Sequence, residues 1–219
     1  DQLAGTIPDG IRNILDVGSG TGSNALGLVQ KGYAVDCVCP SPKLNQIARR
    51  KLPENSRIFE SRFEDLSLER DYDLMIFSES FHYLDAMAAL RKVCAHARRN
   101  VIVFDYFPRK DSASNVRVSH AQFAGLIAQN FADKLRIAGD RDLTREIIPT
   151  FRVLDEFKDN FARPFVERAI ADFRLSHPFY SFLLGWPLRK LLAKVGKKSD
   201  RAQAFLNAYE YRLILLSRI

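Results

Sequence analysis

A glycine-rich turn near the start of the chain carries the clearest chemical signal in the sequence. Residues 16–22 read Asp-Val-Gly-Ser-Gly-Thr-Gly and end a short apolar stretch that begins at Ile11. The three glycines let the chain turn sharply and let a ligand approach the bare backbone. A helix is predicted from about Ser23, so its free N–H groups and the positive end of its dipole would face that ligand. The turn therefore predicts a ligand-binding loop.

Two other glycine-loop chemistries fit this turn less well. A dinucleotide fingerprint requires glycine at its first, third and sixth positions, and the sixth position here is Ser23. A phosphate-binding loop of the Walker type ends in Gly-Lys-Ser/Thr, which is absent. An NAD(P)-dependent oxidoreductase therefore stays a weaker alternative.

Three titratable side chains are candidates for acid–base work. His82 follows a predicted strand, where it could act as a base near neutral pH or bond a loop backbone. Asp105 ends another predicted strand, where it could face a ligand or cap a helix. His120 opens a predicted helix and could reach the site from above or lie on the surface. Zinc is not predicted, because the three cysteines provide no second close pair of ligands.

The elements that must position these residues alternate between strands and helices. Such alternation with apolar strands predicts a parallel sheet covered by helices on both faces, with ligands beyond the carboxyl ends of the strands. We expect an α/β fold with a doubly wound, mostly parallel seven-stranded sheet and a helical insertion before the last strand. The predicted segments are 1–143 for the core, 144–200 for the insertion and 201–219 for a terminal strand that completes the sheet. The predicted strands cover residues 11–17, 33–39, 57–60, 72–77, 101–104, 134–138 and 211–216.

Composition and charge exclude several other classes of protein. Of the 219 residues, 47% are hydrophobic and 27% are charged, which is enough to bury a core. No apolar run reaches the ~18 residues of a membrane span. Three cysteines and no visible secretory signal predict a reducing, cytoplasmic location. The net charge of +7 is concentrated in residues 151–219, which hold 13 Lys/Arg and 7 Asp/Glu.

Four stretches of the chain resemble class I S-adenosylmethionine-dependent methyltransferases. The glycine-rich turn and the strand before it closely resemble the first motif of this family, and the resemblance extends over residues 11–107. The stretches are residues 14–22, 39–44, 63–66, and 71–74 together with 81–84.

The resemblance implies which residues would bind S-adenosylmethionine and its product S-adenosylhomocysteine. Asp16 and the backbone of 18–22 would hold the methionine end, Phe63 and Glu64 would flank the adenine, and the end of the fourth strand would line the entrance to the acceptor site. Two positions depart from the family, because Cys39 and Arg62 stand where acids usually bind the ribose and the adenine. The implied cofactor residues are Asp16, Gly18, Ser19, Gly20, Thr21, Gly22, Cys39, Pro40, Arg62, Phe63, Glu64, Ser78, Glu79 and Ser80.

The insertion contains an apolar and then basic segment over residues 178–198. It could close an apolar acceptor pocket, contact a membrane surface through Trp186 and the lysines, or be core with a solvated basic face. Nucleic acid is not expected, because the aromatics cluster in apolar runs instead of alternating with Arg and Lys.

The predicted function is methyl transfer to a small, partly apolar acceptor of the kind found in bacterial secondary metabolism, and the basic insertion would suit an anionic one. The alternative from another class is a binding module that kept the fold without catalysis, which the departures at Cys39 and Arg62 would favour.

Overall fold

The computed structural model describes residues 3–196 and 200–219, and it divides into two compact units. The first unit contains residues up to Leu143 together with Ala208–Ile219, and the second contains Thr144–Asn207. Lys197 and Lys198, part of the predicted basic segment, lie outside the described residues.

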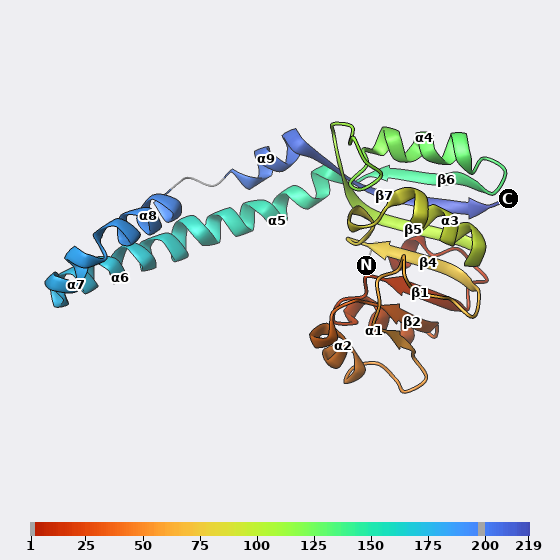
Figure 1. The fold of residues 1–219 in the computed structure, drawn as a ribbon, viewed down its shortest axis with the longest axis horizontal. Coiled ribbons are helices and arrows are strands. Elements are labelled where there is room, and N and C mark those ends of the chain that lie inside the picture. The colour runs from red at the N-terminus through yellow and green to blue at the C-terminus, as the bar shows by residue number, and fades with distance from the viewer. Residues whose placement is uncertain (1–2, 197–199) are drawn as a thin grey trace. The chain divides into compact units, whose positions relative to one another are not determined.

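The first unit is built on a seven-stranded sheet with the order β3-β2-β1-β4-β5-β7-β6 (Figure 1). All pairs from β3 to β5 are parallel, whereas β7 runs antiparallel to both β5 and β6. This arrangement confirms the predicted fold class. The strands are β1 (Asn13–Val17), β2 (Ala34–Val38), β3 (Ile58–Phe59), β4 (Tyr72–Ser78), β5 (Ala97–Pro108), β6 (Leu135–Asp142) and β7 (Tyr209–Arg218).

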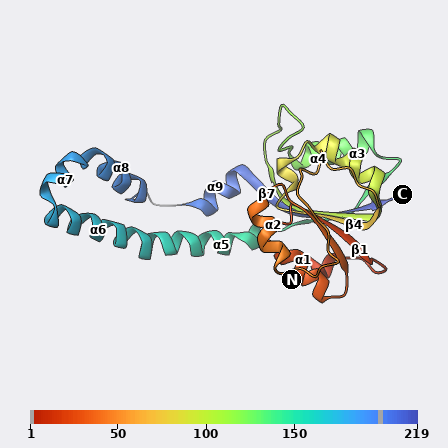
Figure 2. The ribbon, with the colours of Figure 1, turned by 60° about the horizontal axis from the view of Figure 1, so that its bottom comes forward.

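Helices cover both faces of this sheet, with α3 and α4 on one face and α1 and α2 on the other (Figure 2). The central strands are therefore buried on both sides and read as continuous apolar runs; Ile14, Leu15, Met75 and Ile76 have no exposed surface. The helical segments of this unit are η1 (Ala4–Thr6), α1 (Ser23–Gln30), α2 (Pro42–Arg49), η2 (Phe81–Tyr83), α3 (Ala86–His96) and α4 (His120–Asn130).

The second unit is entirely helical among its described residues. α5, η3 and α6 follow one another without a break, and α8 lies beside α6 (Figure 1). None of the described helices is long and apolar enough to cross a membrane. The segments are α5 (Thr144–Phe157), the π-helical η3 (Lys158–Ala162), α6 (Arg163–Ser176), α7 (Pro178–Leu183), α8 (Gly185–Gly196) and α9 (Arg201–Ala208).

Several predicted elements differ from the structure at their ends. The largest difference is at β5, which covers Ala97–Pro108 where only 101–104 was predicted. β3 has two residues instead of four and lies at the sheet edge, where short strands are common. β6 extends four residues beyond its predicted end, because its pairing with β7 continues as far as Asp142 opposite Arg212. The segment 201–219 is not all strand: it begins with α9, whose N-terminus is capped by Asp200 through the Gln203 N–H at 3.0 Å.

Candidate functional site

A cavity of about 210 Å³ opens at the carboxyl ends of the parallel strands. Val17 and Val38 are the last residues of β1 and β2, and Ser80 follows β4. In an open α/β sheet this edge is where ligands bind. The lining residues are Val17, Gly18, Val38, Pro40, Ser61, Arg62, Phe63, Glu64, Ser80, Tyr83 and Leu84.

Position 18 requires glycine for two reasons, its backbone conformation and the close approach of Ser80. Its φ is +81°, and a Cβ added to it would lie 2.3 Å from the Cβ of Ser80. Ser80 cannot move away easily, since its hydroxyl donates to the Val17 carbonyl at 2.6 Å and the residue is buried. The two strand ends therefore approach closely only because residue 18 has no side chain.

The glycine turn offers fewer free amides than its sequence suggests. The N–H groups of Gly18 and Ser19 both donate to the Val38 carbonyl, at 2.8 and 3.2 Å, and the Gly22 N–H donates to Ser19. The N–H groups of Gly20 and Thr21 have no hydrogen-bond partner in the described part of the chain. Two amides therefore tie the turn to the end of β2 and a third bonds within the turn, so the amides of Gly20 and Thr21 are the ones left for a ligand.

Asp16 lies beneath this turn and is almost completely buried. Burial raises its pKa to about 7, from an ordinary value of 3.8. Its Oδ2 atom has no hydrogen-bond partner among the described residues. A buried carboxyl with an unsatisfied oxygen suits a cationic group such as the ammonium of an amino-acid moiety.

Cys39 does not line the cavity, although Pro40 beside it does. The Cys39 carbonyl accepts a hydrogen bond from Nδ2 of the buried Asn45 at 3.0 Å, and the same amide donates to the Glu60 carboxylate at 3.1 Å. A carboxylate is therefore held close to the end of β2 although residue 39 is not an acid.

Ser78 and Glu79, at the end of β4, also lie outside the cavity lining. The Ser78 hydroxyl accepts a hydrogen bond from Asn24 at 3.4 Å. Glu79 has a φ of +52°, and its Oε1 accepts from the Tyr211 hydroxyl at 2.7 Å. The positive φ of a residue that is not glycine, one position before Ser80, is a strained conformation of the kind found at functional sites.

His82 and Asp105 form a buried pair next to the cavity. His82 Nδ1 lies 2.8 Å from Asp105 Oδ1, and Asp105 also accepts from the backbone N–H groups of His82 and Tyr106. A carboxylate can only accept, so Nδ1 carries the proton and Nε2 is free to act as a base. Nε2 is buried and has no partner among the described residues.

The His82 ring is covered by two tyrosines. The Tyr83 and Tyr106 ring centroids lie 3.8 and 4.2 Å from its own. The space beside the pair, lined in part by Arg117, is only about 10 Å³, which is at most one water. Because Nε2 is buried, a substrate can reach it only if neighbouring side chains move, and Tyr83 is the more exposed of the two tyrosines.

His120 belongs to a different cluster. Its Nε2 lies 2.8 Å from Asp140 Oδ2, and Arg212 joins Asp140 and Glu210 at 2.9 and 3.0 Å. None of these residues lines the cavity. The structure thus brings His82 and Asp105 together but leaves His120 in an ion-pair network around β6 and β7.

Six of the predicted cofactor residues line the cavity, and five lining residues were not predicted. The five unpredicted residues are mostly apolar and lie close in sequence to predicted ones. Their closeness to the predicted strand ends was the signal that could have found them. The first group is Gly18, Pro40, Arg62, Phe63, Glu64 and Ser80, and the second is Val17, Val38, Ser61, Tyr83 and Leu84.

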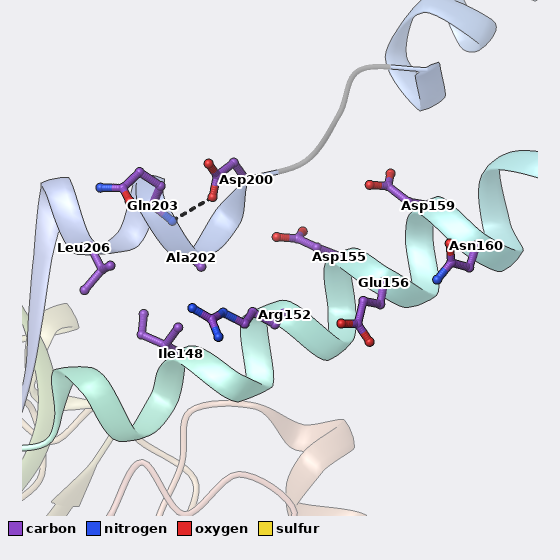
Figure 3. A pocket seen from close by; sticks show the side chains of 10 residues that line it. All are labelled: Ile148, Arg152, Asp155, Glu156, Asp159, Asn160, Asp200, Ala202, Gln203 and Leu206. Carbon is purple, nitrogen blue, oxygen red and sulfur yellow. Dashed lines mark hydrogen bonds between the residues drawn. The ribbon is translucent and has the colours of Figure 1, made fainter.

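A second cavity, of about 370 Å³, lies within the helical unit between α5 and α9 (Figure 3). Asp155, Glu156, Asp159 and Asp200 give it an acidic lining, with Arg152 as the basic member. Asp155 receives the backbone N–H of Arg201 at 3.0 Å, so this acidic group neutralises the positive N-terminal end of α9. No group of three or more possible metal ligands occurs in the described ranges 3–196 and 200–219.

Comparison with known families gives a match over part of the core. The family described as "Methyltransferase domain" matches residues 14–101, which contain the glycine turn, the loop of Phe63 and His82. With the strand order above, this match confirms the resemblance stated from the sequence. Residues 14–101 thus match methyltransferase domains, and the sheet has the Rossmann-like methyltransferase fold that was predicted.

Curated relatives and solved structures agree with this match. An uncharacterized methyltransferase of Mycobacterium tuberculosis is 28% identical over 87 residues, covering 40% of this chain and 36% of the relative. The cypemycin N-terminal methyltransferase of Streptomyces is 28% identical over 93 residues, covering 40% and 38%. The match thus spans little more than a third of these relatives' length.

Two solved structures share the fold over nearly the whole chain. The StiE O-methyltransferase domain has a TM-score of 0.66 at 17% identity, covering 99% of this chain and 71% of that one. Geranyl diphosphate C-methyltransferase from Streptomyces coelicolor has a TM-score of 0.62 at 14% identity, covering 95% and 70%. The latter was crystallised with Mg²⁺, a geranyl thiolodiphosphate and S-adenosylhomocysteine.

Proposed function

We propose that this chain transfers a methyl group from S-adenosylmethionine to a small, partly apolar acceptor. The observation that carries the proposal is the cavity at the ends of β1, β2 and β4, within the segment that matches methyltransferase domains. Its lining is largely apolar, through Val17, Val38 and Leu84, which suits an aromatic base and an apolar acceptor.

The residues present fit this cofactor. The buried, unpartnered Oδ2 of Asp16 and the free N–H groups of Gly20 and Thr21 provide an acceptor and two donors at one turn. An amino-acid moiety has the complementary ammonium and carboxylate groups. When bound, S-adenosylmethionine supplies a methyl group that its sulfonium already activates, so much of the rate can come from alignment and desolvation.

We propose His82 as the base for acceptors that must lose a proton. Asp105 fixes the ring and stabilises its positive charge, while Nε2 takes the proton from the acceptor. The acceptor's electron pair then forms the bond to the methyl carbon as the carbon–sulfur bond breaks. Tyr83, which both lines the cavity and lies over His82, is the side chain that would move to admit the acceptor.

A thermal-shift series tests the proposed cofactor. We expect S-adenosylmethionine and S-adenosylhomocysteine to stabilise the protein, by about 2.7 kcal/mol at 100 times Kd, and NAD and NADP to have no effect. Stabilisation by NAD or NADP alone would favour the oxidoreductase alternative. No stabilisation by any of the four would favour a binding module without cofactor.

The helical insertion is proposed to supply the acceptor contacts. Val153, Phe157, Phe161 and Phe165 recur at intervals of four along α5, η3 and α6, and all four are exposed. Contiguous exposed apolar side chains of this kind often mark a surface that contacts a ligand or a partner. Hydrogen exchange of 144–196 should slow when S-adenosylhomocysteine and an apolar acceptor are added together; unchanged exchange would argue against a lid.

A lipid surface is the second candidate for part of this insertion. Residues 173–199 contain six Lys/Arg and no Asp/Glu. Phe182 and Trp186 are largely exposed, and Lys190 Nζ lies 5.0 Å from the Trp186 ring. Apolar and basic groups side by side suit an anionic membrane surface. Flotation with phosphatidylglycerol vesicles at low and high salt tests this proposal. Absence of binding at low salt would argue against the lipid surface and in favour of the lid.

A further inference from the structure

Lys92 makes three backbone hydrogen bonds to one wall of the cavity. From helix α3, its Nζ donates to the carbonyls of Phe63, Glu64 and Leu66 at 2.6, 2.7 and 2.7 Å. It also lies 5.3 Å from the centroid of the Phe63 ring. An ammonium has three protons, so each of them serves a carbonyl of this one loop.

These bonds orient the peptide groups of the loop. All described peptide bonds are trans, so the C=O and the following N–H of a peptide point in opposite directions. Fixing the Phe63 carbonyl on Lys92 therefore aims the Glu64 N–H away from α3. The N–H groups of Phe63 and Glu64 have no partner among the described residues, and both residues line the cavity.

Unpaired main-chain donors at a cavity wall suit a heteroaromatic ring whose nitrogens accept hydrogen bonds. The side chain at the position where an acid was expected, Arg62, is exposed and can only donate. The Glu64 carboxylate, whose Oε2 is buried without a partner among the described residues, can only accept and so suits an exocyclic amine. An acceptor nitrogen of the ring needs a donor, which the unpaired Glu64 N–H supplies, and Lys92 orients that peptide.

We propose that Lys92 is a positioning residue that fixes the main chain of residues 63–66 as the purine-recognition wall of the cavity. This inference rests on the proposed function, because it concerns the base of the same cofactor. Lys92 does not touch the reacting atoms, and it acts through the loop.

The contrasting explanation is that Lys92 only ties α3 to the loop and stabilises the fold. Val93, the next residue of α3, is fully buried in the core and provides the matched control. Val93→Ala lowers stability through lost packing without changing a bond to the loop.

The experiment compares two ligands by calorimetry. S-adenosylhomocysteine has an acceptor at N1 of its purine, whereas S-inosylhomocysteine has a donor there. We expect the wild type to bind the adenosyl compound at least about tenfold more tightly, the value of one hydrogen bond. Lys92→Met should weaken binding of the adenosyl compound about tenfold and reduce this preference. Val93→Ala should keep the preference, and Lys92→Arg should recover part of it.

An unchanged preference in Lys92→Met, or an equal loss in Val93→Ala, would overturn the positioning role while the proposed function stands. If the wild type binds neither compound, both the proposed function and this inference are overturned.

Discussion

Replacing Asp16 with asparagine removes the ionisable group beneath the glycine turn while keeping its shape. Burial raises the pKa of Asp16 from 3.8 to about 7. This difference corresponds to about 4 kcal/mol of unfavourable free energy for ionising the carboxyl in the ligand-free protein. The carboxyl is fully buried, so solvent screening does not reduce that figure appreciably.

The sign of the pH dependence follows from which state loses its proton first. The unfolded chain releases the Asp16 proton near pH 4, whereas the folded protein keeps it until about pH 7. The contribution of this group to the free energy of unfolding therefore falls by about 4 kcal/mol between these values and is constant above them. Relative to the wild type, Asp16→Asn should gain about 4 kcal/mol between pH 4 and pH 8, measured by urea unfolding.

Cofactor binding should reverse this penalty. An ammonium group placed at Oδ2 lowers the pKa of Asp16, so binding of S-adenosylhomocysteine near pH 6 should release a proton. Calorimetry in two buffers of different ionisation enthalpy measures that proton, and Asp16→Asn should abolish its release. Cys37, on the neighbouring strand, does not interfere, since its pKa is raised to about 12, mainly by burial. A difference in stability between wild type and variant that is independent of pH would refute the reasoning.

Four further substitutions test other parts of the site, and a fifth serves as a control. Gly18→Ala should destabilise the protein by about 2–4 kcal/mol, because its Cβ would lie 2.3 Å from a neighbouring side chain at a φ of +81°. The control is Gly27→Ala, in open space within α1, which should stabilise the protein by up to about 1 kcal/mol. Urea unfolding measures both changes. Cys39→Asp should tighten S-adenosylmethionine binding about tenfold by calorimetry, and no change would mean that the ribose is held elsewhere. His82→Ala should slow methyl transfer to a hydroxyl acceptor about 10²–10⁴-fold in a radiolabel assay, while the Kd for the cofactor changes by no more than about threefold. Asp105→Asn should also slow the transfer. Rates equal to that of the wild type would contradict the role of His82 as the base.

The sheet could be predicted because its signals are local. Apolar runs, glycine turns and helical spacing each lie within a few neighbouring residues, and together they determine the order of strands and helices. Element ends were less predictable, since they depend on partners elsewhere. β6 continues to Asp142 because β7 pairs with it, and α9 forms in a segment expected to be strand because Asp200 caps it.

The polar contacts of the site were less accessible to sequence reasoning. His82 and Asp105 were both candidates, but their contact depends on η2 folding back against the end of β5. His120 had the same standing in the sequence, and its position beside Asp140 follows from β6 and β7, which are separated by the whole insertion. Residue type alone cannot distinguish a histidine beside the cavity from one in an ion-pair network.

The glycine turn shows where a motif stops being informative. Its glycines indicate that the backbone can turn sharply, but which of its amides remain free depends on acceptors outside the motif. The Val38 carbonyl, one strand away, takes two of them, and Gly20 and Thr21 keep theirs. Likewise, Lys92 from α3 donates to three carbonyls of the loop of Phe63, while the N–H groups of Phe63 and Glu64 have no partner among the described residues. In both places the proposed binding groups include main-chain amides, and distant residues decide which of these amides a ligand can use.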